Sequence, residues 1–107
     1  MATPPPSEPF KFEVGQIVHH VRYDYRGVIF DRDPECHASE EWWMGNQSQP
    51  RRDQPWYHVL VDGAEHTTYV AESNLEPDPS GEPIRHPFLP QAFQSFVGGR
   101  YHADNLN

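Results

Sequence analysis

The sequence has one cysteine and no long apolar run, and each scarcity excludes a class of protein. Cys36 cannot form an intrachain disulfide, which favours a reducing compartment. No stretch approaches the roughly 18 apolar residues that a membrane-spanning helix requires. Residues 1–9 also lack the basic and apolar regions of a signal peptide. We therefore expect a cytoplasmic protein that does not enter a membrane.

Positive charge is scarce as well. Lysine and arginine together number 8 against 16 aspartate and glutamate residues, so the 107-residue chain has a net charge of −8 with its histidines neutral. Such a chain repels polyanions at long range, whereas indiscriminate nucleic-acid binding requires many cationic side chains to neutralise phosphates. The composition argues against a general nucleic-acid-binding protein.

Motifs of catalysis and of metal binding are missing. The sequence has no nucleophile elbow, no phosphate-binding loop and no HExxH. It also has no CxxC or HxxxH pair, and zinc requires about four nitrogen or sulfur ligands. The adjacent Cys36 and His37, or His58 and His66 facing each other across a hairpin, would supply too few. We predict no enzymatic activity, no cofactor and no metal site.

What the sequence does contain is a series of short β-prone runs. Residues 56–61 and 66–71 are rich in aromatic and β-branched residues, and Asp62-Gly63 between them is a hairpin signal. Pro55 cannot donate a backbone hydrogen bond, so it marks the start of the first run. Two earlier strands are predicted at 14–22 and 28–31, with Gly27 at a positive-φ turn position and a 3₁₀-like turn at 71–75.

The order of these runs predicts an all-β fold, a small and strongly bent antiparallel barrel over residues 10–76. Residues 35–54 form a long excursion, in which Ser39 is a plausible N-cap for a short helix that ends at Gly45. Residues 1–9 are predicted to be a disordered lead.

The C-terminal segment, residues 77–107, is predicted to be a proline-rich wrap followed by one short helix from about Pro90. Phe93, Phe96 and Val97 have the i, i+3, i+4 spacing of one helical face, and Gly98-Gly99 would end the helix. Such a helix either packs on the barrel or binds a partner.

Four blocks of sequence resemble a known family. They are VGQIVHH at 14–20, YRGVI at 25–29, RDQPWYHVLVD at 52–62 and YVAESNLE at 69–76. In this order they resemble the YccV-like hemimethylated-DNA-binding family, which includes heat-shock proteins of the HspQ type and a C-terminal module of an F-box protein. The resemblance implies a five-stranded SH3-like barrel that binds DNA. It also implies a second possibility, a proteostasis adaptor that modulates an ATP-dependent protease, and it implies no catalytic residue.

Two candidate sites correspond to these two functions. A strip made of His20, Arg22, Tyr25 and Arg26 interleaves basic and aromatic residues, which suits phosphate contact with base stacking. A groove lined by Trp56, Tyr57 and Tyr69 would suit a protein partner, because aromatic grooves bind peptides and cationic side chains. The same aromatic residues could simply build the core. Self-association through exposed strand edges remains a third possibility.

Overall fold

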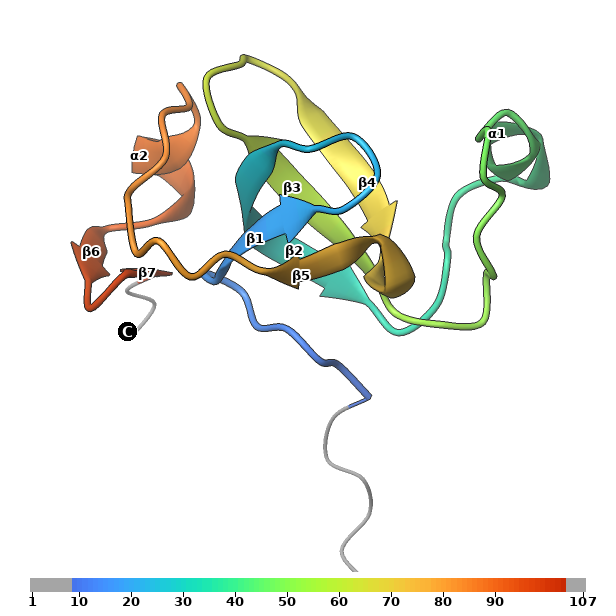
Figure 1. Ribbon diagram of the computed structural model, residues 1–107, viewed down its shortest axis with the longest axis horizontal. Coiled ribbons are helices and arrows are strands. Elements are labelled where there is room, and N and C mark those ends of the chain that lie inside the picture. The colour runs from blue at the N-terminus through green and yellow to red at the C-terminus, as the bar shows by residue number, and fades with distance from the viewer. Residues whose placement is uncertain (1–8, 104–107) are drawn as a thin grey trace, which may run out of the picture.

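The computed structural model describes residues 9–103, so the predicted lead lies almost wholly outside the described residues. Its centre is a five-stranded antiparallel sheet in the order β4-β3-β2-β1-β5 (Figure 1). The strands are β1 Ile17–His20, β2 Arg26–Asp33, β3 Trp56–Val61, β4 Thr67–Ala71 and β5 Leu75–Pro77. The all-β class is confirmed. Within residues 9–103 no ladder joins β4 to β5, so these two strands are the edges of the sheet.

The hairpin of β3 and β4 forms as the sequence predicts. β3 begins directly after Pro55, and a 3₁₀ turn at Glu72–Asn74 leads from β4 into β5. The expected pairing of His58 with His66 is wrong, because the register places His58 opposite Tyr69. The loop between Val61 and His66 has four residues, 62–65, two more than the tightest hairpin turn, and this length decides which side chains meet across the two strands.

Gly27 has a different role from the predicted one. The left-handed backbone in the β1–β2 turn belongs to Asp24, with φ 59°, whereas Gly27 lies inside β2. A Cβ atom on Gly27 would lie 2.4 Å from Val59 Cγ1 and 2.5 Å from the Leu60 carbonyl oxygen. Glycine is needed here because β2 and β3 approach too closely for any side chain.

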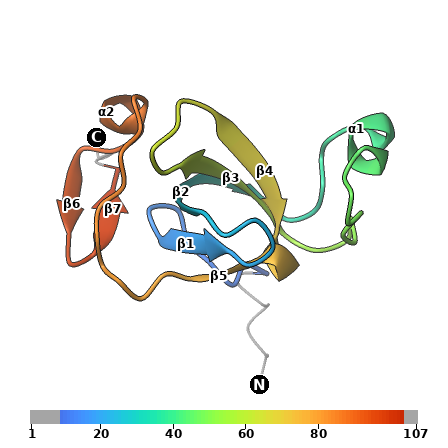
Figure 2. The same ribbon diagram turned by 45° about the horizontal axis from the view of Figure 1, so that its top comes forward.

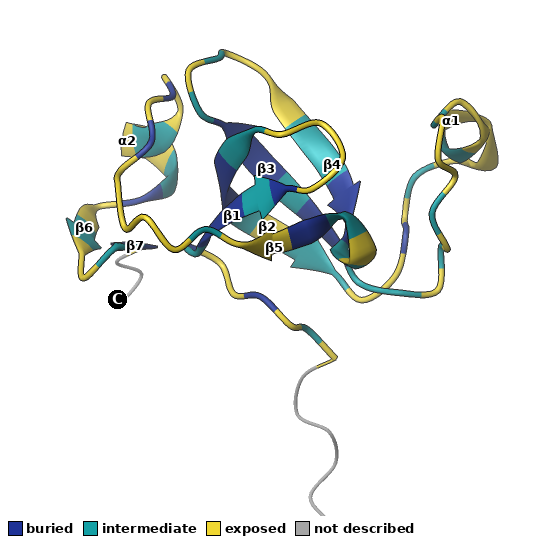
Figure 3. Ribbon diagram, viewed as in Figure 1, coloured by how far each residue is buried: buried dark blue, intermediate teal, exposed yellow. Residues whose placement is uncertain are grey.

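Buried residues run along the central strands (Figure 3), and apolar clusters form on both faces of the sheet. One face packs a cluster of Val18, Ile29, Tyr57, Val59, Val70 and Leu75, closed by Phe12 from the segment that precedes β1. The other face packs Ile17, Val28 and Leu60 against Ile84, Phe93 and Tyr101 of the C-terminal segment. A smaller third cluster joins Cys36, Trp56 and Ala71. The C-terminal segment thus completes the core of a sheet that is too small to bury its own apolar faces.

The predicted C-terminal helix is mostly wrong. The structure has a single turn, α2 Leu89–Ala92, followed by a hairpin of β6 Ser95–Val97 and β7 Arg100–His102. Gly98 and Gly99 both have positive φ, 65° and 77°. Two such residues make the two-residue turn that matches the twist of paired strands. Gly98-Gly99 is therefore a hairpin turn and not a helix terminator.

The excursion contains the predicted helix, α1 Glu40–Met44. Ser39 is its N-cap, because the Ser39 hydroxyl oxygen accepts a hydrogen bond from the Trp42 backbone N–H at 3.1 Å. Figures 1 and 2 place α1 and the β6–β7 hairpin on opposite sides of the sheet. No helix in residues 9–103 is long and apolar enough to cross a membrane.

Candidate binding pocket

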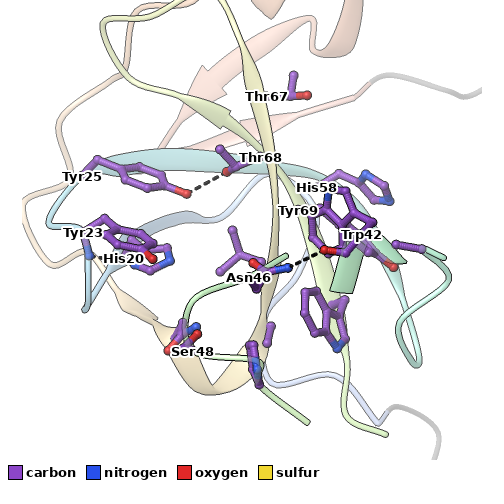
Figure 4. Close-up of a pocket in the computed structure, with 16 residues that line it drawn as sticks. His20, Tyr23, Tyr25, Trp42, Asn46, Ser48, His58, Thr67, Thr68 and Tyr69 are labelled. Carbon is purple, nitrogen blue, oxygen red and sulfur yellow. Dashed lines mark hydrogen bonds between the residues drawn. The ribbon is translucent and has the colours of Figure 1, made fainter. Parts of the chain in front are cut away.

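A pocket of about 490 Å³ lies along β4, between the β1–β2 turn and the excursion (Figure 4). Its lining is mainly aromatic with a few polar groups. The lining side chains include His20, Tyr23, Tyr25, Trp42, Asn46, Ser48, Trp56, His58, Thr68, Tyr69 and Asn74. Pockets that bind small groups combine an apolar lining with a few placed polar atoms in this way, at volumes of roughly 300–1,000 Å³.

One side of the pocket, the tyrosine wall, is made of Tyr23, His20 and Tyr25. The His20 ring stacks with both tyrosines, at centroid distances of 4.8 and 5.0 Å and interplanar angles near 30°. The Tyr25 hydroxyl is held at 2.7 Å from Thr68 Oγ1, and burial raises the pKa of Tyr25. This wall therefore joins the β1–β2 turn to strand β4.

His20 is neutral in this wall. Its Nδ1 accepts hydrogen bonds from the backbone N–H groups of Arg22 and Tyr23, at 3.1 and 3.0 Å, so the ring proton belongs to Nε2. Burial lowers the pKa of His20, and the positive charges of His19 and Arg22 act in the same direction. His20 contributes a flat, uncharged ring and not the cationic group that the predicted basic strip requires.

The opposite side, the tryptophan wall, is made of Trp42, Trp56 and Tyr69. The centroid distances are 5.9 Å for Trp42–Trp56, 5.6 Å for Trp42–Tyr69 and 5.2 Å for Trp56–Tyr69. Rings at these distances touch one another, so no group fits between them. Trp56 is 1% exposed and Trp42 is 42% exposed. The wall is thus a platform with a buried base and an open outer ring.

A carboxylate lies behind the tryptophan wall. The Tyr69 hydroxyl donates to Asp33 Oδ2 at 2.6 Å, and His58 Nε2 lies 3.2 Å from the same oxygen. Burial raises the pKa of Asp33, but the hydrogen bonds from Tyr69 and His58 outweigh it and hold that pKa below its usual value. Asp33 is therefore ionised at neutral pH. In residues 9–103 no group of three or more His, Cys, Asp or Glu is placed to hold a metal ion.

The structure brings the two predicted sites together. His20 and Tyr25 come from the predicted DNA strip, Trp56 and Tyr69 come from the predicted protein groove, and all four line the same pocket. Arg22 is exposed beside it, with its guanidinium carbon 5.7 Å from the centre of the Tyr23 ring. Four of the residues proposed for separate functions therefore share one surface.

Two predicted site residues lie elsewhere. Arg26 donates to Asp62 at 3.2 Å and to Asp78 at 3.0 Å, which fixes its guanidinium to the loop after β3 and the segment after β5. Tyr57 is buried in the core, and its hydroxyl donates to Glu72 at 2.6 Å while accepting from the Lys11 and Phe12 N–H groups. In this structure Arg26 is engaged by carboxylates, and Tyr57 belongs to the core and not to the groove.

Trp42 is the main pocket residue that sequence reasoning missed. It lies on α1, next to Trp43, whose indole N–H donates to the Pro50 carbonyl. Neighbouring residues on a helix point about 100° apart, so two adjacent tryptophans cannot both be buried on one face. The Trp42-Trp43 pair was the available signal that one of these indoles stays exposed.

The chain is similar in sequence to known proteins. Residues 10–100 match the family described as "Hemimethylated DNA-binding protein YccV like". The chain is 37% identical over 93 residues to F-box only protein 21 of Homo sapiens and 36% identical to that of Mus musculus. Each match covers 84% of this chain and 15% of the relative, so the likeness concerns one segment of a much longer protein.

Proposed function

Since the chain belongs to the YccV-like hemimethylated DNA-binding family, we propose that it is a non-catalytic binding module whose ligand occupies the aromatic pocket. The observation that carries the proposal is the exposure of aromatic rings at the two walls. Tyr23 is 55% exposed and Trp42 is 42% exposed, beside rings that are fully buried. Large apolar side chains left open around a concave surface mark an interaction site.

DNA is the first candidate ligand, because it is the ligand that the description of the family names. A base that is unpaired or turned out of a duplex stacks on aromatic side chains, and each such contact contributes about 1–3 kcal/mol. Asn46, Ser48 and Asn74 supply polar groups that could hydrogen-bond the edges of a base. Arg22 beside Tyr23 could contact a phosphate.

Electrostatics limits this DNA complex. Arg26 is engaged by Asp62 and Asp78, which leaves Arg22 as the arginine of the predicted strip that could meet a phosphate. Each neutralised phosphate changes the slope of log K against log salt by about −0.9. DNA binding by this pocket should therefore have a slope of about −1 to −2, far shallower than that of proteins which hold a duplex by its backbone.

A protein segment is the second candidate ligand, and the net charge of −8 favours it. An acidic chain attracts cationic partners and repels polyanions. In this case the module would act as an adaptor, for example in proteostasis by modulating an ATP-dependent protease or recruiting its substrates. Pairing with a second copy of the chain belongs to the same class of protein contact.

Fluorescence anisotropy with one duplex in hemimethylated, fully methylated and unmethylated forms tests the DNA candidate. Binding should be strongest for the hemimethylated form and should weaken about tenfold or more in Trp42→Ala, because a stacking contact is lost. Phe88→Ala is the matched control, since Phe88 is an exposed aromatic residue that does not line the pocket.

The outcomes are separable. Equal binding by Trp42→Ala and Phe88→Ala would refute the pocket as the DNA site. Equal affinity for the three duplex forms would contradict recognition of hemimethylated DNA, but it would still be compatible with the pocket as a DNA-binding site. If no duplex binds even at low salt, the DNA candidate is wrong and a protein segment is the remaining candidate ligand.

A further inference from the structure

Strand β4 runs through the pocket as an open edge. Among residues 9–103 its pairing partner is β3 alone, on one side. Figure 4 shows the β4 ribbon between Tyr23 and Tyr25 on one side and Tyr69 and Trp42 on the other. Exposed strand edges are templates for pairing with a further strand. The pocket is therefore a channel along an unpaired edge, with an aromatic wall on each face of the sheet.

The register determines which backbone groups of β4 face the open side. The Glu72 N–H donates to the Pro55 carbonyl and the Val61 N–H donates to the His66 carbonyl, one at each end of the hairpin. Hydrogen-bonded pairs alternate along an antiparallel ladder, so the bonded residues of β4 are Thr68 and Val70.

It follows that the backbone N–H and C=O groups of Thr67, Tyr69 and Ala71 point away from β3. Ala71 is 1% exposed and packs against Cys36 and Trp56, so the open edge consists of Thr67 and Tyr69. Within the described residues these groups have no backbone partner on another segment. Their spacing of two residues is the spacing at which an added strand forms its hydrogen bonds.

The two walls suit alternate side chains of such a strand. Thr68 contacts Tyr25, whereas Tyr69 contacts Trp42 and Trp56. Successive residues of a strand point to opposite faces, so the tyrosine wall and the tryptophan wall lie on opposite faces of β4. A strand added beside β4 would direct one side chain to the first wall and the next side chain to the second.

The charges near the channel favour a cationic occupant. Ionised Asp33 lies behind Tyr69, Glu40 and Glu41 precede Trp42 on α1, and Asp24 lies in the β1–β2 turn with 90% of its side chain exposed. Two arginines oppose these carboxylates: Arg22, and Arg52, which donates to the Ala38 and Ser39 carbonyls. His19 also pairs with Asp24, but the carboxylates still outnumber the arginines. Tryptophan and tyrosine faces also attract ammonium and guanidinium groups.

We propose that the channel binds an extended segment of a partner protein, which adds to the β4 edge and places lysine or arginine side chains on the aromatic walls. This inference rests on the proposed pocket as the binding surface, and it makes a peptide the ligand in place of DNA. Main-chain hydrogen bonds to Thr67 and Tyr69 give affinity, and the walls select the side chains.

Amide hydrogen exchange, measured residue by residue on the full chain, tests the edge directly. In the free protein the N–H groups of Thr67 and Tyr69 should exchange at least about tenfold faster than those of Thr68 and Val70, because the latter are bonded to β3. The probe is a capped peptide of alternating lysine and valine at millimolar concentration. It should slow exchange at the amides of Thr67 and Tyr69 by about tenfold or more and leave those of Thr68 and Val70 unchanged.

Two matched peptides separate the contributions. Replacing lysine by glutamate should abolish the protection, because the channel is acidic. Methylating the peptide backbone nitrogens keeps the charges but removes the donors, and it should also abolish the protection. If the N-methylated peptide binds as well as the parent, attraction is purely electrostatic and edge pairing is wrong. Absence of protection at millimolar parent peptide also overturns the inference.

The variant Trp42→Ala distinguishes failure of this inference from failure of the proposed function. If a hemimethylated duplex binds, loses affinity in Trp42→Ala and leaves the outward amides of β4 unprotected, the pocket is a DNA site and the peptide inference fails alone. If neither the peptide nor the duplex responds to Trp42→Ala, both fail. Thr67→Pro removes one outward N–H and should weaken the peptide by about fivefold while leaving stacking with the tryptophan wall intact.

Discussion

Aromatic side chains gather at both ends of the five-stranded sheet, and the two groups differ in what covers them. At one end Phe93 and Tyr101 pack over the sheet, Tyr101 is 7% exposed, and its hydroxyl accepts from the Ile84 N–H at 3.0 Å. At the other end Trp42 and Tyr23 line a pocket and stay about half exposed. The first group has its polar atoms paired within the chain, whereas the second presents open rings beside an unpaired strand.

The difference shows how to separate core aromatics from ligand-binding ones in a small domain. Both ends are rich in aromatic residues, so composition alone does not separate them. Coverage by the rest of the chain does separate them. Burial of a covered ring already stabilises the fold, whereas an exposed ring becomes buried only when a ligand binds. Variants at the covered end should therefore lower stability, and variants at the open end should lower binding.

The largest effect on stability is expected for Tyr101→Ala. The substitution removes a buried ring and leaves a cavity against Ile17, Val28 and Leu60, so the free energy of unfolding should fall by about 3–5 kcal/mol. Urea denaturation measures this change. Tyr101→Phe keeps the ring but leaves the buried Ile84 N–H without its acceptor, which should cost about 1–3 kcal/mol.

A loss smaller in Tyr101→Ala than in Tyr101→Phe would contradict the role of the ring as packing. Where Tyr101→Ala is still folded, it should bind at the pocket as the unchanged protein does.

Trp42→Ala should show the opposite pattern. Its indole is exposed on a short helix that stands away from the sheet, so the free energy of unfolding should change by about 1 kcal/mol or less. Ligand binding at the pocket should nevertheless fall. Denaturation and binding measured on the same sample check both halves. A large loss of stability would mean that the tryptophan wall belongs to the core and not to a binding site.

The smallest effect, a difference in pH dependence, is expected between neighbouring histidines of β1. His19 lies 2.7 Å from carboxylates of both Asp24 and Glu76, and the hydrogen bond to Asp24 is the largest cause that raises its pKa. A raised pKa in the folded state stabilises below the unfolded value of about 6.5, and the contribution is lost as pH rises through the folded pKa. The difference in free energy of unfolding between the unchanged protein and His19→Gln should therefore become smaller at alkaline pH.

His20 should behave in the opposite sense. Burial lowers its pKa, so the neutral ring stabilises the fold above a pH of about 6.5, and that contribution falls as pH drops towards the folded pKa. The difference in free energy of unfolding between the unchanged protein and His20→Gln should become smaller at acid pH. Denaturation at several pH values tests both predictions. If the two differences become smaller at the same end of the pH range, the assignment of opposite environments to the two faces of β1 is wrong.

Local sequence patterns predicted much of the fold. Pro55, the β-branched run after it and Asp62-Gly63 located the β3–β4 hairpin, and Ser39 located α1, because these signals act within a few residues of the structure they cause. The same reasoning failed at residues 93–97. Helical spacing of Phe93, Phe96 and Val97 is also compatible with a hairpin, and the pairing of β6 with β7 decides between them.

The pocket could be predicted only in part. Trp56 and Tyr69 were recognisable as groove candidates, and His20 and Tyr25 as part of a separate strip. Their union in one pocket depends on β4 passing between the β1–β2 turn and the excursion, which no local pattern encodes. The engagement of Arg26 by Asp62 and Asp78 is also invisible in sequence, because the partners lie 36 and 52 residues away.

The sequence by itself determined the all-β class, the main hairpin, the cap of α1 and an acidic character, since each follows from steric and hydrogen-bonding preferences of adjacent residues or from a sum of charges. The tertiary structure decided which aromatic rings are covered. The C-terminal segment buries one group against the sheet, whereas α1 stands off and leaves the other open along β4. Coverage depends on which distant segments meet, and only packing of the whole chain sets that.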